Sequence, residues 1–119
     1  HLMTIDKQTP YGGINISMEA IGAIAGTSAM ECYGVLGLAP KASKDNVFEI
    51  LKKEDIHQGI AARKGKDGYE VDLFIVVAFG VKVTEVVAEV QKKVKYVLEK
   101  TFDIKFKSIN VYVQGIKCI

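Results

Sequence analysis

Four residue types are scarce in this chain of 119 residues, and the scarcity excludes several classes of protein. The sequence contains 2 cysteines, 2 histidines, 2 prolines and no tryptophan. Cys32 and Cys118 are too few for a disulfide framework, and their spacing does not match that of a metal site. We therefore expect a cytoplasmic protein, from a reducing compartment, that binds no metal.

Arginine is also scarce. Of the 16 basic residues only Arg63 is an arginine, and 14 acidic residues reduce the net charge to +2. Proteins that bind nucleic acids through the phosphates carry a larger basic excess, and bidentate phosphate contacts favour arginine. Nucleic acid is therefore not an expected partner.

Long apolar runs are missing as well. The longest candidate, residues 71–81, has the length of a strand and contains Asp72, whereas a membrane-spanning helix needs ~20 apolar residues. The N-terminus has no basic segment followed by an apolar run, and we interpret His1 and Leu2, which precede Met3, as a cloning remnant. We expect no direct insertion into a membrane.

Residues for catalysis or cofactor binding do not form a recognisable set. His57 has no acid or nucleophile at a diagnostic spacing, and Cys32 falls near the end of a predicted helix, where the helix dipole opposes a thiolate. The glycines match neither a dinucleotide-binding nor a P-loop motif. We predict no catalytic residues, no cofactor and no enzymatic activity.

What the chain does contain is a large share of apolar residues. Hydrophobic residues make up 49% of the sequence, and the mean hydropathy is +0.16. A domain of this size has one core and a large surface, so part of this apolar surface should remain exposed after folding. We expect one domain over residues 1–119 that self-associates or binds protein partners.

The first half of the sequence predicts a strand and two helices. A weak strand over residues 12–16 precedes a helix that begins at Met18, capped by Ser17 and ended by Gly34. Residues 34–42 contain two glycines and a proline and are predicted to be a loop. A short helix, capped by Ser43 or Asp45, should then run to Lys53.

The second half has stronger patterns. A strand over residues 56–64 and a turn at residues 65–68 lead into an apolar strand over residues 69–79. One face of this strand is lined by apolar residues, namely Val71, Leu73, Ile75, Val77 and Phe79. Its later half should be buried on both sides, so we place this strand at the centre of the sheet. A long helix follows, capped by Thr84 and ending near Phe102, and then a strand over residues 106–116.

These elements predict an α/β (α+β) two-layer sandwich in the order β-α-(α)-β-β-α-β. A three- to four-stranded mixed sheet should have its helices packed on one face. A right-handed crossover through the long helix would place the last strand parallel to the central strand, beside it or one strand away. The position of the first strand in the sheet stays open.

One motif supports an alternative function. Gly34, Val35, Leu36 and Gly37 form a GXXG sequence, and in a β-α-α-β-β-α order such a loop is how a KH domain clamps single-stranded RNA. The two central residues are apolar, however, and the first basic residue after the motif is Lys41. We keep a KH-like RNA-binding module as the alternative hypothesis.

Five segments lie in order along the chain: residues 9–17, 31–39, 79–81, 90–95 and 110–116. Together they resemble the alkaline-shock protein family, specifically its YloU-like branch. The resemblance covers nearly the whole chain. It implies a bacterial, mostly Gram-positive, cytoplasmic protein of the envelope or alkaline stress response, of unknown molecular function and without enzymatic activity. It also implies assembly into homo-oligomers and docking on a membrane-anchored protein.

Our main hypothesis is therefore a non-enzymatic interaction protein. Tyrosines suit interfaces because they bury a large area and keep a polar group. We predict an interaction surface that consists of Tyr11, Tyr33, Gly34, Val35, Leu36, Gly37 and Tyr112.

Overall fold

Strand β5 (Gly68–Ala78) lies at the centre of the molecule, as its apolar sequence predicts. Val71, Leu73 and Ile75 are fully buried beneath the helices, and Val76 is fully buried on the opposite face. The later half of the strand is therefore covered on both sides, as predicted. The computed structural model describes residues 4–9, 12–41 and 50–118, with side chains from Ser17 onward.

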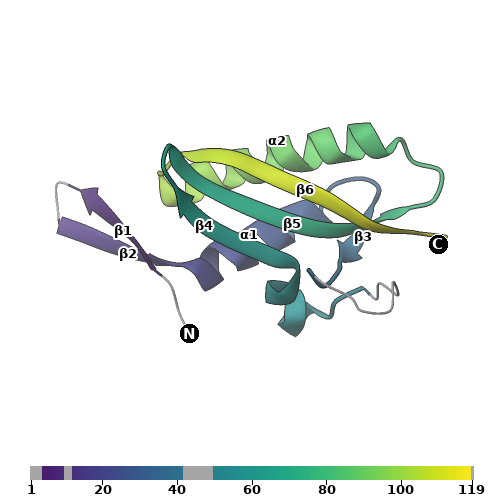
Figure 1. Cartoon of the computed structure of the whole chain (residues 1–119), viewed down its shortest axis with the longest axis horizontal. Coiled ribbons are helices and arrows are strands. Elements are labelled where there is room, and N and C mark those ends of the chain that lie inside the picture. Colours follow the sequence, from purple (N-terminus) through teal and green to yellow (C-terminus); the bar gives the residue numbers. More distant parts are fainter. Residues whose placement is uncertain (1–3, 10–11, 42–49, 119) are drawn as a thin grey trace.

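The two edges of β5 are paired differently. Strand β6 (Phe106–Lys117) runs parallel to β5 along its full length. On the other edge, β4 (Ile60–Gly65) pairs with the first half of β5 and β3 (Val35–Leu38) with the second half, both antiparallel. The sheet is therefore mixed, and this edge is divided between two short strands that follow one another (Figure 1).

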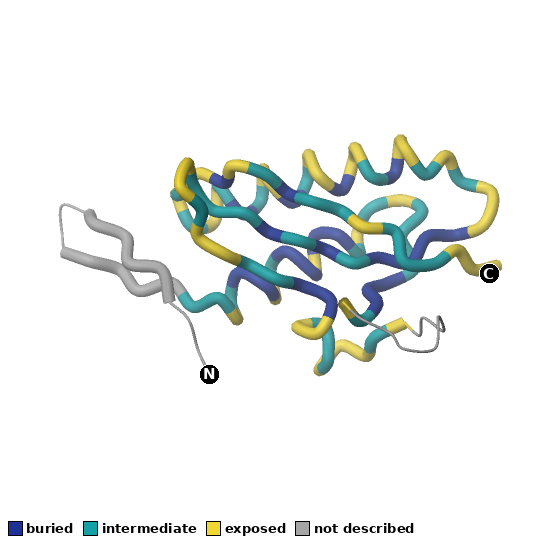
Figure 2. The backbone as a smooth tube through the Cα atoms, viewed as in Figure 1, coloured by how far each residue is buried: buried dark blue, intermediate teal, exposed yellow. Residues whose placement is uncertain are grey.

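Helices α1 (Met18–Met30) and α2 (Val83–Phe102) cover one face of this sheet (Figure 1). In α2, Val86, Val90 and Val94 recur every four residues and are buried, which outweighs the weak helix propensity of valine. The exposed positions of α2 face away from the sheet (Figure 2). The predicted α+β two-layer sandwich is confirmed.

Small residues let α1 pack closely on the sheet. A Cβ atom at Gly26 would lie 3.1 Å from Ile60 Cδ1 and 3.2 Å from Leu38 Cδ1. Ser17 caps the helix as predicted, because its Oγ accepts a hydrogen bond from the Ala20 amide at 2.9 Å.

The predicted end of this helix and the predicted loop after it are wrong. α1 ends at Met30, so Cys32 lies in the following turn. Gly34 does have a positive φ of 89°, but it leads into strand β3 and not into a loop. The apolar residues of β3 gain a partner strand and backbone hydrogen bonds, which a local sequence pattern does not reveal.

The prediction for residues 43–64 is corrected in part. Residues 42–49, which include Ser43 and Asp45, lie outside the described residues, and residues 50–52 are not helical. The 3₁₀ helix η1 (Lys53–Gly59) occupies the start of the predicted strand, so that His57 lies in η1 and β4 begins at Ile60.

The elements around β5 agree better with the sequence. Gly65 pairs with Gly68 across a two-residue turn, and Gly68 has a φ of 135°. Helix α2 begins one residue before Thr84, and its N-cap residue Lys82 makes no side-chain capping bond, so the predicted Thr84 cap is wrong. The crossover through α2 places β6 parallel to β5 and directly beside it, the first of the two predicted positions.

The predicted first strand belongs to a separate two-stranded ribbon. Strand β2 (Gly12–Ser17) pairs antiparallel with β1 (Thr4–Thr9), a strand that the sequence pattern did not predict. The ribbon extends away from the sheet and leads directly into α1 (Figure 1).

Candidate functional site

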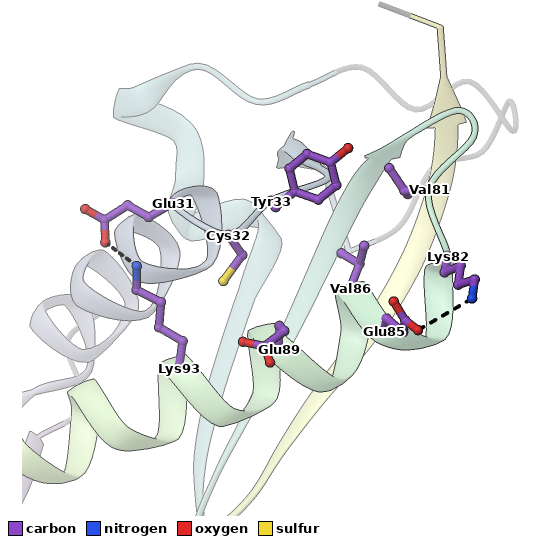
Figure 3. Close-up of a pocket in the computed structure, with 9 residues that line it drawn as sticks. All are labelled: Glu31, Cys32, Tyr33, Val81, Lys82, Glu85, Val86, Glu89 and Lys93. Atoms are coloured by element: carbon purple, nitrogen blue, oxygen red, sulfur yellow. Dashed lines mark ion pairs between the residues drawn. The ribbon is translucent and has the colours of Figure 1, made fainter.

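Tyr33 is the most exposed of the predicted interaction residues whose side chains are described. It follows α1, and 87% of its surface is accessible. The neighbouring Gly34 carbonyl accepts a hydrogen bond from the Ala78 amide at 2.9 Å, which fixes this turn beside the end of β5. The ring of Tyr33 lies beside Val81, which belongs to the segment that connects β5 to α2 (Figure 3).

Two more large apolar side chains are exposed at the same end of the sheet. Phe79 follows β5 and is 73% exposed, and Ile116 in β6 is 55% exposed. The Phe79 amide donates a hydrogen bond to the Lys117 carbonyl at 2.8 Å. Tyr33, Phe79 and Ile116 thus come from three neighbouring chain segments at the carboxyl end of β5. We call these three residues the end patch.

A groove adjoins the end patch between the end of α1 and the first half of α2. It encloses about 480 Å³, and Figure 3 shows its lining. Val81 and Val86 are apolar, whereas the lysine and glutamate side chains stand at the rim. Lys93 Nζ lies 3.1 Å from Glu31 Oε1, and this ion pair connects the two helices. The groove therefore has an apolar floor and a rim of mixed charge.

Cys32 is the one thiol in this groove. Burial raises the pKa of the Cys32 thiol, although the Lys93 ammonium opposes the shift. Cys32 Sγ donates a weak hydrogen bond to the Ser28 carbonyl at 3.6 Å. The thiol form is therefore favoured, which makes Cys32 a poor nucleophile. Within residues 4–9, 12–41 and 50–118, no cluster of three His, Cys, Asp or Glu side chains could hold a metal ion.

Tyr112 lies on the other face of the sheet and not with Tyr33. Its strand neighbours Val111 and Val113 pack against the helix-covered core, whereas the Tyr112 ring stacks on Phe74 with centroids 4.9 Å apart. Tyr112 is 46% exposed. The predicted interaction residues therefore divide between two faces of the protein.

A polar ladder continues this open face beyond the aromatic pair. Arg63 Nη1 donates a hydrogen bond to Asp72 Oδ2 at 2.6 Å, and Asn110 Nδ2 donates to Asp72 Oδ1 at 2.8 Å. Ser108 Oγ donates to Glu70 Oε1 at 2.8 Å. The bond to Asp72 raises the pKa of the Arg63 guanidinium. The carboxylates of Glu70 and Asp72 on β5 are thus hydrogen-bonded by residues of the neighbouring strands. The ladder therefore stabilises the sheet through cross-strand pairs.

The remaining predicted residues form part of the sheet. Val35, Leu36 and Gly37 lie in β3, and Gly37 is buried. An RNA-binding GXXG loop must leave its backbone free to approach phosphates, whereas this segment is paired with β5. The loop required by the KH-like hypothesis is therefore not present here. Tyr11 lies outside the described residues.

Sequence reasoning missed Phe79 and Ile116. The alternation along residues 69–79 places Phe79 on the buried face with Val77, and this assignment was wrong because Phe79 is 73% exposed. The sequence feature that could have indicated the exposure of Phe79 is Gly80. This glycine ends the strand, so Phe79 lies at the margin of the sheet.

Comparison with known proteins finds bacterial relatives over nearly the whole length of the chain. Uncharacterized protein YloU of Bacillus subtilis (strain 168) is 41% identical over 116 residues, which cover 97% of each chain. Uncharacterized protein Spy1614 of Streptococcus pyogenes serotype M6 is 37% identical over 98% of each chain. Uncharacterized protein YqhY of Bacillus subtilis is 30% identical over 98% of this chain and 86% of its own.

Among solved structures, MamM CTD aligns with a TM-score of 0.49 at 18% identity, covering 82% of this chain and 94% of that one. In the described part of the chain, no helix has the length and hydropathy of a membrane span.

The family comparison agrees with the resemblance inferred from the five segments. The model of the alkaline shock protein 23 family, described by a cell envelope-related function, matches residues 6–118. The chain therefore belongs to the alkaline shock protein 23 family.

Proposed function

We propose that this protein is a non-enzymatic, cytoplasmic assembly protein of the envelope or alkaline stress response. It acts by contacts between its own copies and with a membrane-anchored protein. The family's envelope-related description supports the cellular role.

The end patch is the observation that carries this proposal. Tyr33, Phe79 and Ile116 are each more than half exposed and lie at one end of the sheet. Large apolar side chains grouped at one place on a surface mark interaction sites, whereas isolated ones are common on any protein. Copies that bury this patch would remove apolar area from water, which favours association.

Light scattering coupled to gel filtration tests the end patch. The double variant Tyr33→Ser, Phe79→Ser removes two of its three side chains. We expect the wild type to have a mass above that of one chain and the double variant to have a lower mass. Circular dichroism should be unchanged, because both residues are exposed.

Tyr96→Ser is the matched control. Tyr96 is also an exposed aromatic residue, at 62%, but it lies on α2 away from the patch and next to Lys100. Its replacement should leave the mass unchanged. A folded double variant with the wild-type mass would reject the end patch as a contact between copies.

A further inference from the structure

Strand β6 has one edge without a partner strand. Its inner edge pairs with β5, and no other strand in the described ranges pairs with its outer edge. An edge strand presents backbone donors and acceptors that can pair with another chain, unless charges, bulges or a covering element block them. Whether β6 is blocked depends on which backbone groups point outward.

Two backbone hydrogen bonds at the end of β5 identify these outward groups. The Ala78 amide bonds to Gly34 on the β3 side, and the Phe79 amide bonds to Lys117 in β6. Even-numbered residues of β5 therefore bond toward β3, and odd-numbered residues bond toward β6. Leu73 is the register partner of Val111. In a parallel pair, Leu73 then bonds to the residues on either side of Val111, which leaves the amide and carbonyl of Val111 directed outward.

The same alternation directs the backbone groups of Ile109 and Val113 outward, and two features limit how much of this edge is free. The Ile109 carbonyl accepts a hydrogen bond from Gln91 Nε2 of α2 at 3.0 Å. At the other end, the register shifts between Val113 and Gly115, which interrupts the alternation. The free and regular part of the edge is therefore residues 110–113.

From this geometry we infer that β6 pairs antiparallel with β6 of a second copy, with the twofold axis at Tyr112. This inference rests on the self-association proposed above and specifies a contact for it. In such a pair, the outward-directed amides and carbonyls of one strand must face those of the other strand. Val111 of each copy therefore lies opposite Val113 of the other copy. The two Val111–Val113 pairs form four backbone hydrogen bonds. A register centred on Val111 would instead need the Ile109 carbonyl that Gln91 already occupies.

The side chains in this window suit a second copy of the same strand. Residues 110–113 carry no charge, so the pairing brings no like charges together within this window. Tyr112 would lie directly opposite Tyr112 of the second copy. This is a non-hydrogen-bonded position of the antiparallel pair, where opposite side chains lie closest. Because each Tyr112 already stacks on Phe74, the two copies would form a row of four aromatic rings on the open face.

Helix α2 also leaves room for the second copy. Lys93 faces α1 through its ion pair with Glu31, whereas Gln91 reaches β6, so these residues mark opposite sides of the helix. On the β6 side, the positions three, four and seven residues before Gln91 are Ala88, Val87 and Thr84. They are small and uncharged.

These positions lie at the level of the proposed axis. α2 runs antiparallel to β6, and Tyr112 lies about 10 Å beyond Ile109 along the strand. That distance corresponds to about seven residues of helix, from Gln91 back to Thr84. The N-terminal halves of the two α2 helices could therefore approach each other without bringing charged side chains together.

Disulfide trapping tests the pairing directly. In a Cys32→Ser, Cys118→Ser background, Tyr112→Cys places one thiol on the twofold axis. The Cα atoms of such a pair are about 4.5 Å apart, within the range of a disulfide. Under mild oxidation we expect a covalent dimer to form several-fold faster than with Tyr96→Cys, a control on α2 whose position is more exposed than that of Tyr112.

A mixed experiment tests the register. Val111→Cys and a tagged Val113→Cys should form the mixed dimer in preference to either symmetric dimer, because these positions face each other. Equal rates for Tyr112→Cys and Tyr96→Cys would overturn the inference, as would a preference for either symmetric dimer in the mixture.

Val111→Pro keeps the proposal testable if Tyr112→Cys does not fold. Proline removes an amide that points outward, a position where edge strands tolerate it. A folded Val111→Pro protein should have a lower mass than the wild type, and an unchanged mass would contradict the pairing.

Adding Tyr33→Ser and Phe79→Ser to Tyr112→Cys should leave disulfide formation unchanged, so that failure of the end patch and failure of the β6 contact can be told apart.

Discussion

At the scale of single residues, Gly34 and Gly80 separate two reasons why a protein needs glycine. Both have a positive φ, of 89° and 94°. A Cβ atom at Gly34 would also lie 2.8 Å from Val86 Cγ2, whereas one at Gly80 would meet nothing within 4 Å. Glycine is therefore required at position 80 by its backbone conformation alone. At position 34 it is required both by its backbone conformation and by the close packing of Val86.

We expect Gly80→Ala to lower the free energy of unfolding by about 1–2 kcal/mol, the cost of a left-handed conformation for a residue with a Cβ atom. Gly34→Ala should cost more, because Val86 must move within the core. Urea denaturation of both variants measures the difference. Equal losses would mean that Val86 accommodates the methyl group at no cost.

The composition of the candidate site could be predicted only in part. Tyr33 and Tyr112 were predicted to belong to one interaction surface, but they lie on opposite sides of the sheet. Phe79 was assigned to the core by the alternation of β5. Alternation states which face a residue occupies, whereas its burial depends on where the covering helix ends, and this is a property of tertiary packing.

At the scale of elements, the capping residues of the two helices provide a matched pair. Ser17 accepts the amide hydrogen bond of Ala20, whereas Thr84 lies inside α2, which has no side-chain cap. Ser17→Ala should lower the free energy of unfolding by ~1 kcal/mol.

Thr84→Ala should leave stability unchanged or raise it slightly, because alanine has the higher helix propensity. Thermal and urea denaturation of the two variants test this contrast. A similar loss in both would show that Thr84 supports the helix by a contact other than a cap.

Long elements with a strong period were predicted well, and short ones were not. The patterns of β5, α2 and β6 extend over 11, 20 and 12 residues, so that local propensity and burial agree. Strand β3 has 4 residues and contains a glycine, so its conformation depends on its partner β5. The start of the predicted strand at Ile56 was wrong for a related reason, because η1 ends only where β4 joins the sheet.

At the scale of the whole molecule, self-association links stability to protein concentration. Copies that associate only when folded stabilise the native state by mass action. We expect the melting temperature of the wild type to rise with protein concentration over a hundredfold range. The rise should be smaller for Tyr33→Ser, Phe79→Ser than for Tyr96→Ser, measured by calorimetry or dye-based melting. A melting temperature of the wild type that is independent of concentration would exclude association in the native state.

The divided edge of the sheet has a consequence for how far such an assembly can grow. A subunit with an uninterrupted strand at both margins could add neighbours on either side without end, as in a fibril. Here β6 offers one continuous margin, while the opposite margin is broken between β4 and β3. Sheet extension through β6 would therefore stop at a closed pair, and any larger assembly would have to grow through a different surface, such as the end patch.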